Sequence, residues 1–117
     1  MQKESIVADK SKAFAIKIIR LYQYLVNERK EFVMAKQILR SGTSIGANIK
    51  ESQRAESKAD FYHKLNIALK EAGETEYWLE LLYECGYMNK QYFDQIYVLC
   101  QELIKLLVSI TKTQKTN

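Results

Sequence analysis

Apolar side chains recur at steps of three and four residues through most of this sequence, which is the spacing of one face of an α-helix. The pattern predicts four helices, at residues 5–28, 32–55, 57–85 and 89–111, followed by a polar tail at 112–117 that frays. The connections between them are short, so consecutive helices are expected to run antiparallel. The predicted fold class is all-α, an antiparallel up-down-up-down four-helix bundle forming a single domain over residues 1–117.

The second predicted helix contains an unusual stretch, Arg40 to Ile49, which holds Gly42 and Gly46. A glycine inside a helix costs about 1 kcal/mol relative to alanine. The stretch is therefore either a loop or a helix that a neighbour approaches closely. The apolar row at residues 34–52 continues through both glycines, which favours the helix. We interpret Gly42 and Gly46 as close-packing residues, and we expect a large side chain at Gly46 to disrupt folding or assembly.

Helix-end signals accompany this pattern. Ser57 followed by Asp60 is typical of a capped helix start, and Asn89 can cap the fourth helix. Gly86 follows the third helix, where a left-handed backbone commonly ends a helix. The chain has no proline and four glycines, so few residues interrupt the predicted helices.

Composition places the chain among ordinary globular proteins. Its 117 residues are 47% hydrophobic and 27% charged, enough to form a core. No apolar run has the length of a membrane span or of a signal peptide, so we expect a soluble cytoplasmic protein with no membrane partner. Cys85 and Cys100 lie in apolar helical pattern, which favours buried, reduced thiols over a disulfide.

No motif of this sequence indicates an enzyme. Asp60 and His63 have the spacing of a di-iron ligand pair, but such sites need two pairs and this chain has one histidine. The segment from Gly42 to Gly46 lacks the Gly-Lys-Ser/Thr sequence of a phosphate-binding loop. The interpretation is a non-enzymatic protein with no catalytic residues, no cofactor and no metal site.

The apolar arcs of three helices are wider than one bundle core can absorb. A monomer would expose Trp78, Leu81, Leu99 and Leu106, an apolar surface that soluble monomers rarely tolerate. We therefore expect a homo-oligomer rather than a monomer.

The chain has 18 basic and 14 acidic residues, and its net charge of +4 is too small by itself to indicate a nucleic-acid-binding protein. The most suggestive functional feature is the alignment of basic residues along the helices. Cations in a line can follow a phosphate backbone, and tyrosines such as Tyr22, Tyr24 and Tyr62 can stack on bases. The alternative is a solvated helix face with ordinary salt bridges. The candidate nucleic-acid-binding residues on the first two helices are Lys10, Lys17, Arg20, Lys36, Arg40, Lys50 and Arg54.

The second and third predicted helices also carry a family resemblance. Its motifs read Leu-Arg-Ser-Gly-Thr-Ser-Ile-Gly-Ala-Asn-Ile-Lys-Glu-Ser-Gln-Arg-Ala-Glu-Ser-Lys-Ala-Asp-Phe at residues 39–61, Lys-Leu-Asn-Ile-Ala-Leu-Lys-Glu-Ala at 64–72 and Thr-Glu-Tyr-Trp-Leu at 75–79. The chain resembles the bacterial four-helix-bundle proteins related to those encoded in intervening sequences of the 23S ribosomal RNA gene.

This resemblance implies an antiparallel bundle that assembles into a homopentamer with a central channel. A related branch acts as the accessory protein of diversity-generating retroelements, together with a reverse transcriptase and RNA. The resemblance transfers no catalytic or cofactor residue. The resulting hypothesis is an oligomeric accessory protein that binds RNA or a nucleic-acid-processing protein. The alternative is a structural or protein-interaction oligomer with no nucleic-acid role.

Overall fold

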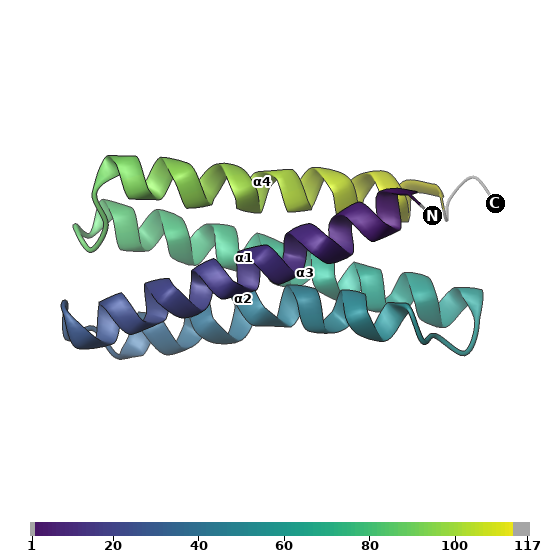
Figure 1. The fold of residues 1–117 in the computed structure, drawn as a ribbon, viewed down its shortest axis with the longest axis horizontal. Helices are drawn as coiled ribbons and strands as arrows, with labels where there is room; N and C mark the ends of the chain where they lie inside the picture. Colours follow the sequence, from purple (N-terminus) through teal and green to yellow (C-terminus); the bar gives the residue numbers. More distant parts are fainter. Residues whose placement is uncertain (1, 114–117) are drawn as a thin grey trace.

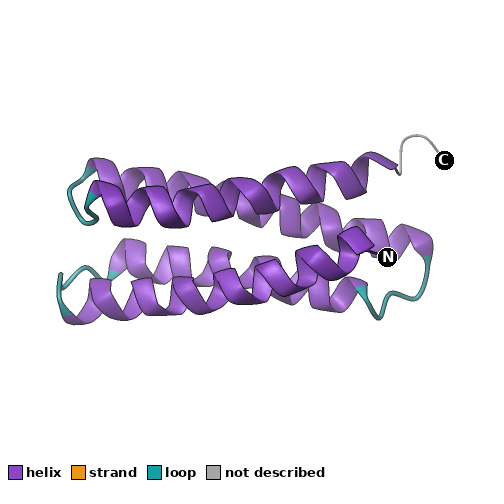
Figure 2. Cartoon of the chain, turned by 45° about the horizontal axis from the view of Figure 1, so that its top comes forward, coloured by secondary structure: helices purple, strands orange, loops and turns teal. Residues whose placement is uncertain are grey.

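Four α-helices make up almost all of residues 2–113, the part of the chain that the computed structural model describes. They are α1 (Gln2–Asn27), α2 (Val33–Ser52), α3 (Lys58–Glu84) and α4 (Lys90–Lys112). Consecutive helices run in opposite directions along the long axis (Figure 1). Two connections therefore lie at one end of the molecule and one at the other (Figure 2). No strand occurs within residues 2–113, and the predicted all-α class is confirmed.

The helix bounds differ from those predicted by a few residues, for local reasons. The first helix begins at Gln2 rather than residue 5, and its early turns are held against the bundle by buried Val7 and by a hydrogen bond from Lys3 to Ser109. The second ends at Ser52 rather than residue 55, because the next amides bond three residues back and tighten the last turn. The last helix includes Lys112, which was assigned to the tail, and residues 114–117 lie outside the described part of the chain.

The core consists of one buried face from each helix, as the apolar spacing predicts. Its largest fully buried side chains are Phe14, Ile18, Leu21 and Leu25 of α1, Ile38, Ile45 and Ile49 of α2, Leu65, Leu79 and Leu82 of α3, and Ile96 and Leu103 of α4.

The stretch from Arg40 to Ile49 is helical throughout, so the loop alternative is wrong. Gly42 is buried, and a Cβ there would lie 2.8 Å from Cγ1 and Cγ2 of Ile18. A Cβ at Gly46 would lie 3.4 Å from the Ser11 carbonyl oxygen. Both glycines therefore face α1: Gly42 makes room for the side chain of Ile18, and Gly46 lies against the backbone of Ser11.

Helix ends follow the capping chemistry in the sequence. Ser57 Oγ accepts a hydrogen bond from the Asp60 amide at 3.0 Å, and Asn89 Oδ1 accepts one from the Tyr92 amide at 2.8 Å. Gly86 has φ of 83°, the left-handed conformation expected after α3. Lys30 also has a positive φ, 54°, in the connection between α1 and α2.

The exposed apolar residues are not the expected ones. Trp78, Leu81, Leu99 and Leu106 are all partly buried within the single chain, and three of them, Trp78, Leu99 and Leu106, pack against the core. The large apolar side chains that do lie exposed are Ile6, Ile16, Ile19, Tyr24, Phe32, Val33, Tyr77, Val98 and Val108. Among residues 2–113, no helix combines the length and apolar character needed to cross a bilayer.

Candidate nucleic-acid interface

The basic residues predicted on the second helix are all exposed. Ile38, Ile45 and Ile49 fill the inward face, so residues on the opposite side of the helical wheel face solvent. The four cations are Lys36, Arg40 and Lys50 of α2, and Arg54, which lies in the turn just after α2 ends.

Arg40 differs from the other three because it is already paired. Its Nη2 lies 2.6 Å from Oε2 of Glu74, and its Nη1 lies 3.6 Å from Oε1 of Glu71. The hydrogen bond with Glu74 is the main reason why the pKa of Arg40 is raised. The pKa of Glu74 is lowered, chiefly because Trp78 Nε1 donates to its carboxylate at 3.2 Å and also because of Arg40. Arg40 thus connects α2 to α3.

Lys10 on α1 is paired in a similar way. Its Nζ lies 3.3 Å from Oε1 of Glu102 on α4. The partial exposure of both side chains makes this a weak surface pair. Lys10 therefore contributes less free positive charge than the sequence suggests.

The other five candidates keep their charge uncompensated by direct contact. Within residues 2–113, no carboxylate lies within 4.0 Å of their charged nitrogens. These residues are Lys17, Arg20, Lys36, Lys50 and Arg54, and all are exposed.

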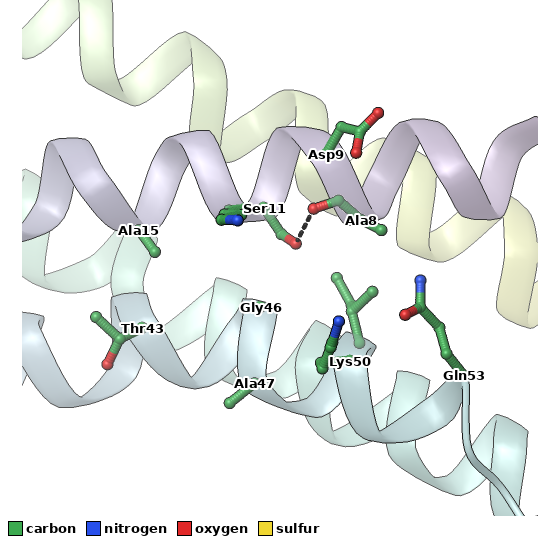
Figure 3. A pocket seen from close by; sticks show the side chains of 11 residues that line it. Ala8, Asp9, Ser11, Ala15, Thr43, Gly46, Ala47, Lys50 and Gln53 are labelled. Carbon is green, nitrogen blue, oxygen red and sulfur yellow. Dashed lines mark hydrogen bonds between the residues drawn. The ribbon is translucent and has the colours of Figure 1, made fainter.

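The structure brings one of them, Lys50, to a groove between α1 and α2 with a volume of about 430 Å³. We call this the α1–α2 groove. Small residues form its floor, with Ala8 and Ala15 on α1 facing Gly46 on α2. Figure 3 shows Lys50 on α2 and Ser11 on α1 at opposite sides of the groove; Ser11 Oγ donates a hydrogen bond to the Ala8 carbonyl oxygen at 2.9 Å.

Lys12 also lines the α1–α2 groove, and sequence reasoning missed it. It was overlooked because it does not share a helical face with Lys10, Lys17 and Arg20. The feature of the sequence that could have indicated Lys12 is its position next to Ser11, one of the small residues of α1 that face the glycines of α2. Asp9 is at the rim, but its carboxylate points away from α2 (Figure 3) and pairs with neither lysine.

Lys17 and Arg20 meet at a different place, a hollow between α1 and α4. The seven predicted cations therefore do not form one continuous site. They divide among the α1–α2 groove, the α1–α4 hollow, the outer face of α2 and two ion pairs.

The tyrosines proposed for base stacking are not equally available. Tyr62 is buried, and its hydroxyl lies 2.7 Å from the Thr113 hydroxyl, so it belongs to the core. Tyr22 is partly buried. Tyr24 is exposed and makes an edge contact with Tyr92 of α4, with ring centroids 6.4 Å apart.

The residues considered for catalysis are dispersed. His63 is exposed, and within residues 2–113 no cluster of three or more His, Cys, Asp or Glu side chains has a metal-binding arrangement. The Gly42–Gly46 segment is helix interior, so its amides are bonded within α2 and do not form a phosphate-binding loop. Cys100 is buried, and burial raises the pKa of its thiol to about 12.

Comparisons with known proteins agree on one family. Residues 3–109 match the family described as 23S rRNA-intervening sequence protein. The chain is also similar to a solved structure, a protein with unknown function from the S23 ribosomal protein family of Bacteroides thetaiotaomicron. That similarity has 60% sequence identity and a TM-score of 0.92, and it covers 94% of this chain and 98% of the other. No curated protein sequence matches the chain.

Proposed function

The chain belongs to the 23S rRNA-intervening sequence protein family, and from that premise we propose that it is a non-enzymatic, homo-oligomeric protein that binds RNA through basic residues of α1 and α2. A pentamer is the assembly that the family resemblance implies. Its partners would be other copies of itself and RNA, alone or together with a nucleic-acid-processing protein.

The observation that carries this proposal is the α1–α2 groove. Lys12 and Lys50 line it from opposite helices, and neither is neutralised by a carboxylate of residues 2–113. A phosphate backbone lying along the groove would meet cations on both walls and small side chains beneath, so little steric bulk opposes its approach. Lys36 on α2 and Arg54 in the turn just after it add further exposed positive charge. Arg40 is excluded from the binding set, because Glu74 and Glu71 occupy its guanidinium.

Charge reversal of both groove lysines tests the proposal. The Lys12→Glu/Lys50→Glu variant is compared with Lys58→Glu/Lys70→Glu, which changes two exposed lysines of α3. Both variants lower the formal net charge from +4 to 0, so a difference between them reports position and not total charge. Affinity for a labelled RNA hairpin with a single-stranded extension is measured by fluorescence anisotropy over a range of salt concentrations.

We expect the groove variant to lose most of its RNA affinity. The slope of log affinity against log salt concentration should also become shallower, by the amount that corresponds to about two lost phosphate contacts. The α3 variant should bind nearly as well as the original chain. Equal losses in the two variants would remove the groove from the proposal. Salt-insensitive or absent RNA binding by the original chain would instead favour a structural or protein-interaction oligomer.

A further inference from the structure

The hollow between α1 and α4 has a different composition from the α1–α2 groove. We call it the α1–α4 hollow, and it has a volume of about 130 Å³. The six residues that line it are Lys17, Arg20, Tyr92, Gln95, Ile96 and Leu99.

These residues divide into three chemical groups. Lys17 and Arg20 stand three residues apart on α1, which places both cations on one wall. Tyr92, Ile96 and Leu99 provide an apolar and aromatic surface on α4, with Ile96 buried and the other two partly buried. Gln95 is exposed on the same helix and offers an amide that can both donate and accept hydrogen bonds.

No carboxylate of residues 2–113 lines this hollow. The neighbouring hollow toward the other end of the α1–α4 seam shares Lys17 and Leu99 but contains Glu102, which is paired with Lys10. Anion binding along the seam is therefore favoured at the end where Lys17 and Arg20 lie. The tyrosine contact between Tyr24 and Tyr92 adds a second aromatic ring beside it.

A ligand that fits must combine a negative charge with a flat, largely apolar group that can form hydrogen bonds. An unpaired nucleotide has these features, because its phosphate can meet the cations and its base can stack on an aromatic ring or an apolar floor. Bases within a duplex are stacked on one another and cannot enter a hollow of this size. We infer that the α1–α4 hollow holds an unpaired base of single-stranded RNA, with its phosphate at Lys17 and Arg20.

This inference rests on the proposed RNA-binding function, and it specifies single strands rather than duplexes. It is tested by replacing Gln95 with glutamate, which keeps the size of the side chain and introduces a carboxylate at the hollow. Gln101→Glu is the matched control, since it adds the same charge to α4 outside the hollow. Each protein is titrated against an unstructured uridine-rich strand and against a fully paired RNA duplex of equal length.

The original chain should prefer the single strand, and Gln95→Glu should weaken single-strand binding by about tenfold, within the range for loss of one stacked base. Duplex binding by Gln95→Glu, and both affinities of Gln101→Glu, should change little. Equal affinity for strand and duplex, together with an unchanged Gln95→Glu variant, would overturn the inference while leaving RNA binding intact. Absence of binding to either RNA would overturn both proposals.

Photocrosslinking locates the base directly. A single strand containing thiouridine is irradiated in complex with the original chain, and tryptic peptides are analysed by mass spectrometry. Crosslinks should fall in the α4 peptide of residues 91–105, which contains Tyr92, Gln95 and Leu99. Crosslinks confined to α2 peptides would contradict this site. Uridine monophosphate at the same nucleotide concentration should not displace the strand, and displacement would assign the hollow to a free nucleotide instead.

Discussion

At the scale of single residues, three glycines lie in helices but in different surroundings. A Cβ at Gly42 would meet Ile18 at 2.8 Å, whereas a Cβ at Gly46 would meet the Ser11 backbone at 3.4 Å. A Cβ at Gly73 would have no atom within 4 Å, apart from the chain adjoining it. The absence of a side chain is therefore required for packing only at Gly42.

Replacing each glycine with alanine should separate these roles. Gly42→Ala should lower the free energy of unfolding by about 1–3 kcal/mol, because the added methyl group overpacks against Ile18. Gly46→Ala should be nearly neutral, and Gly73→Ala should gain up to about 1 kcal/mol from helix propensity. Urea denaturation followed by circular dichroism measures all three. A Gly42→Ala protein as stable as Gly73→Ala would show that α1 moves away at no cost.

The two cysteines should differ sharply in reactivity. The prediction of a buried thiol is wrong for Cys85, which is exposed just after the end of α3. Cys100 is buried, and its Sγ lies 3.4 Å from the Ala72 carbonyl oxygen. Since the thiolate is the reactive form, a pKa of about 12 makes Cys100 inert at neutral pH. A chromogenic disulfide reagent should titrate one thiol in the native protein and two in denaturant. Two fast thiols in the native state would mean that α3 and α4 separate readily.

The same thiol affects stability at alkaline pH. Its pKa is raised from 9.0 when unfolded to about 12 when folded, so the unfolded chain loses its proton first. Cys100 therefore favours the folded state fully below pH 9.0, and this contribution is lost as the pH rises toward 12. Tyr97 adds to the trend, because its hydrogen bond to Glu80 raises the pKa of the phenol.

At the scale of helices, α3 and α4 begin with side-chain caps and α2 does not. Ser57 and Asn89 each accept a hydrogen bond from an amide in the first turn of their helix. Phe32 precedes α2 and cannot cap it, but Glu31 Oε1 accepts a hydrogen bond from the Ala35 amide at 2.8 Å. One of the free amides at the start of α2 is thus satisfied from outside the helix.

Ser57→Ala and Asn89→Ala should each lower the free energy of unfolding by about 1 kcal/mol, the usual cost of a lost N-cap. Ser57→Asp should retain most of the stability, because a carboxylate accepts the same hydrogen bond and suits the positive end of the helix dipole. Chemical denaturation gives these values. Ser5→Ala, an exposed change inside α1, is the control and should cost nothing. Equal losses at Ser5 and Ser57 would refute the capping assignment.

The helices could be predicted from the sequence because each buried row is a local pattern. The row through Ile38, Ile45 and Ile49 needs only the helical period to be recognised. The candidate interface was harder to predict from the sequence, because it depends on how the helices are rotated relative to each other when they pack. The pairing of Arg40 with Glu74, which are 34 positions apart, follows from the contact between α2 and α3 and has no local signature. The position of Lys12 at the α1–α2 groove likewise depends on the packing of α1 against Gly46, which the local sequence does not encode.

At the scale of the whole molecule, each helix packs on its neighbours in sequence, and α1 and α4 close the bundle. Both described ends, Gln2 and Thr113, lie at the same end of the molecule (Figure 1). Most contacts therefore form between segments that a single short turn connects, which is the topology of rapidly folding helical proteins. Eight of the nine exposed large apolar side chains are distributed over all four helices, four of them on α1, and the ninth, Phe32, directly precedes α2.

This exposed apolar surface is consistent with self-association, and mass measurement tests it. The chain has a mass of 13.7 kDa, and light scattering after size exclusion should give a multiple of that value. The melting temperature should also rise with protein concentration, because association stabilises the folded state by mass action. A mass of 13.7 kDa with a melting temperature independent of concentration would exclude the oligomer.

Trp78 is the single tryptophan of the chain. Its indole shares the Oε2 atom of Glu74 with Arg40, so the one strong native fluorophore is situated at the junction of α2 and α3. Intrinsic emission will therefore follow the separation of these two helices during unfolding. This emission should change little when an RNA strand binds at the opposite side of the bundle, between α1 and α4. RNA binding at that seam therefore has to be followed with an extrinsic dye. During such titrations the emission of Trp78 reports independently whether the protein remains folded.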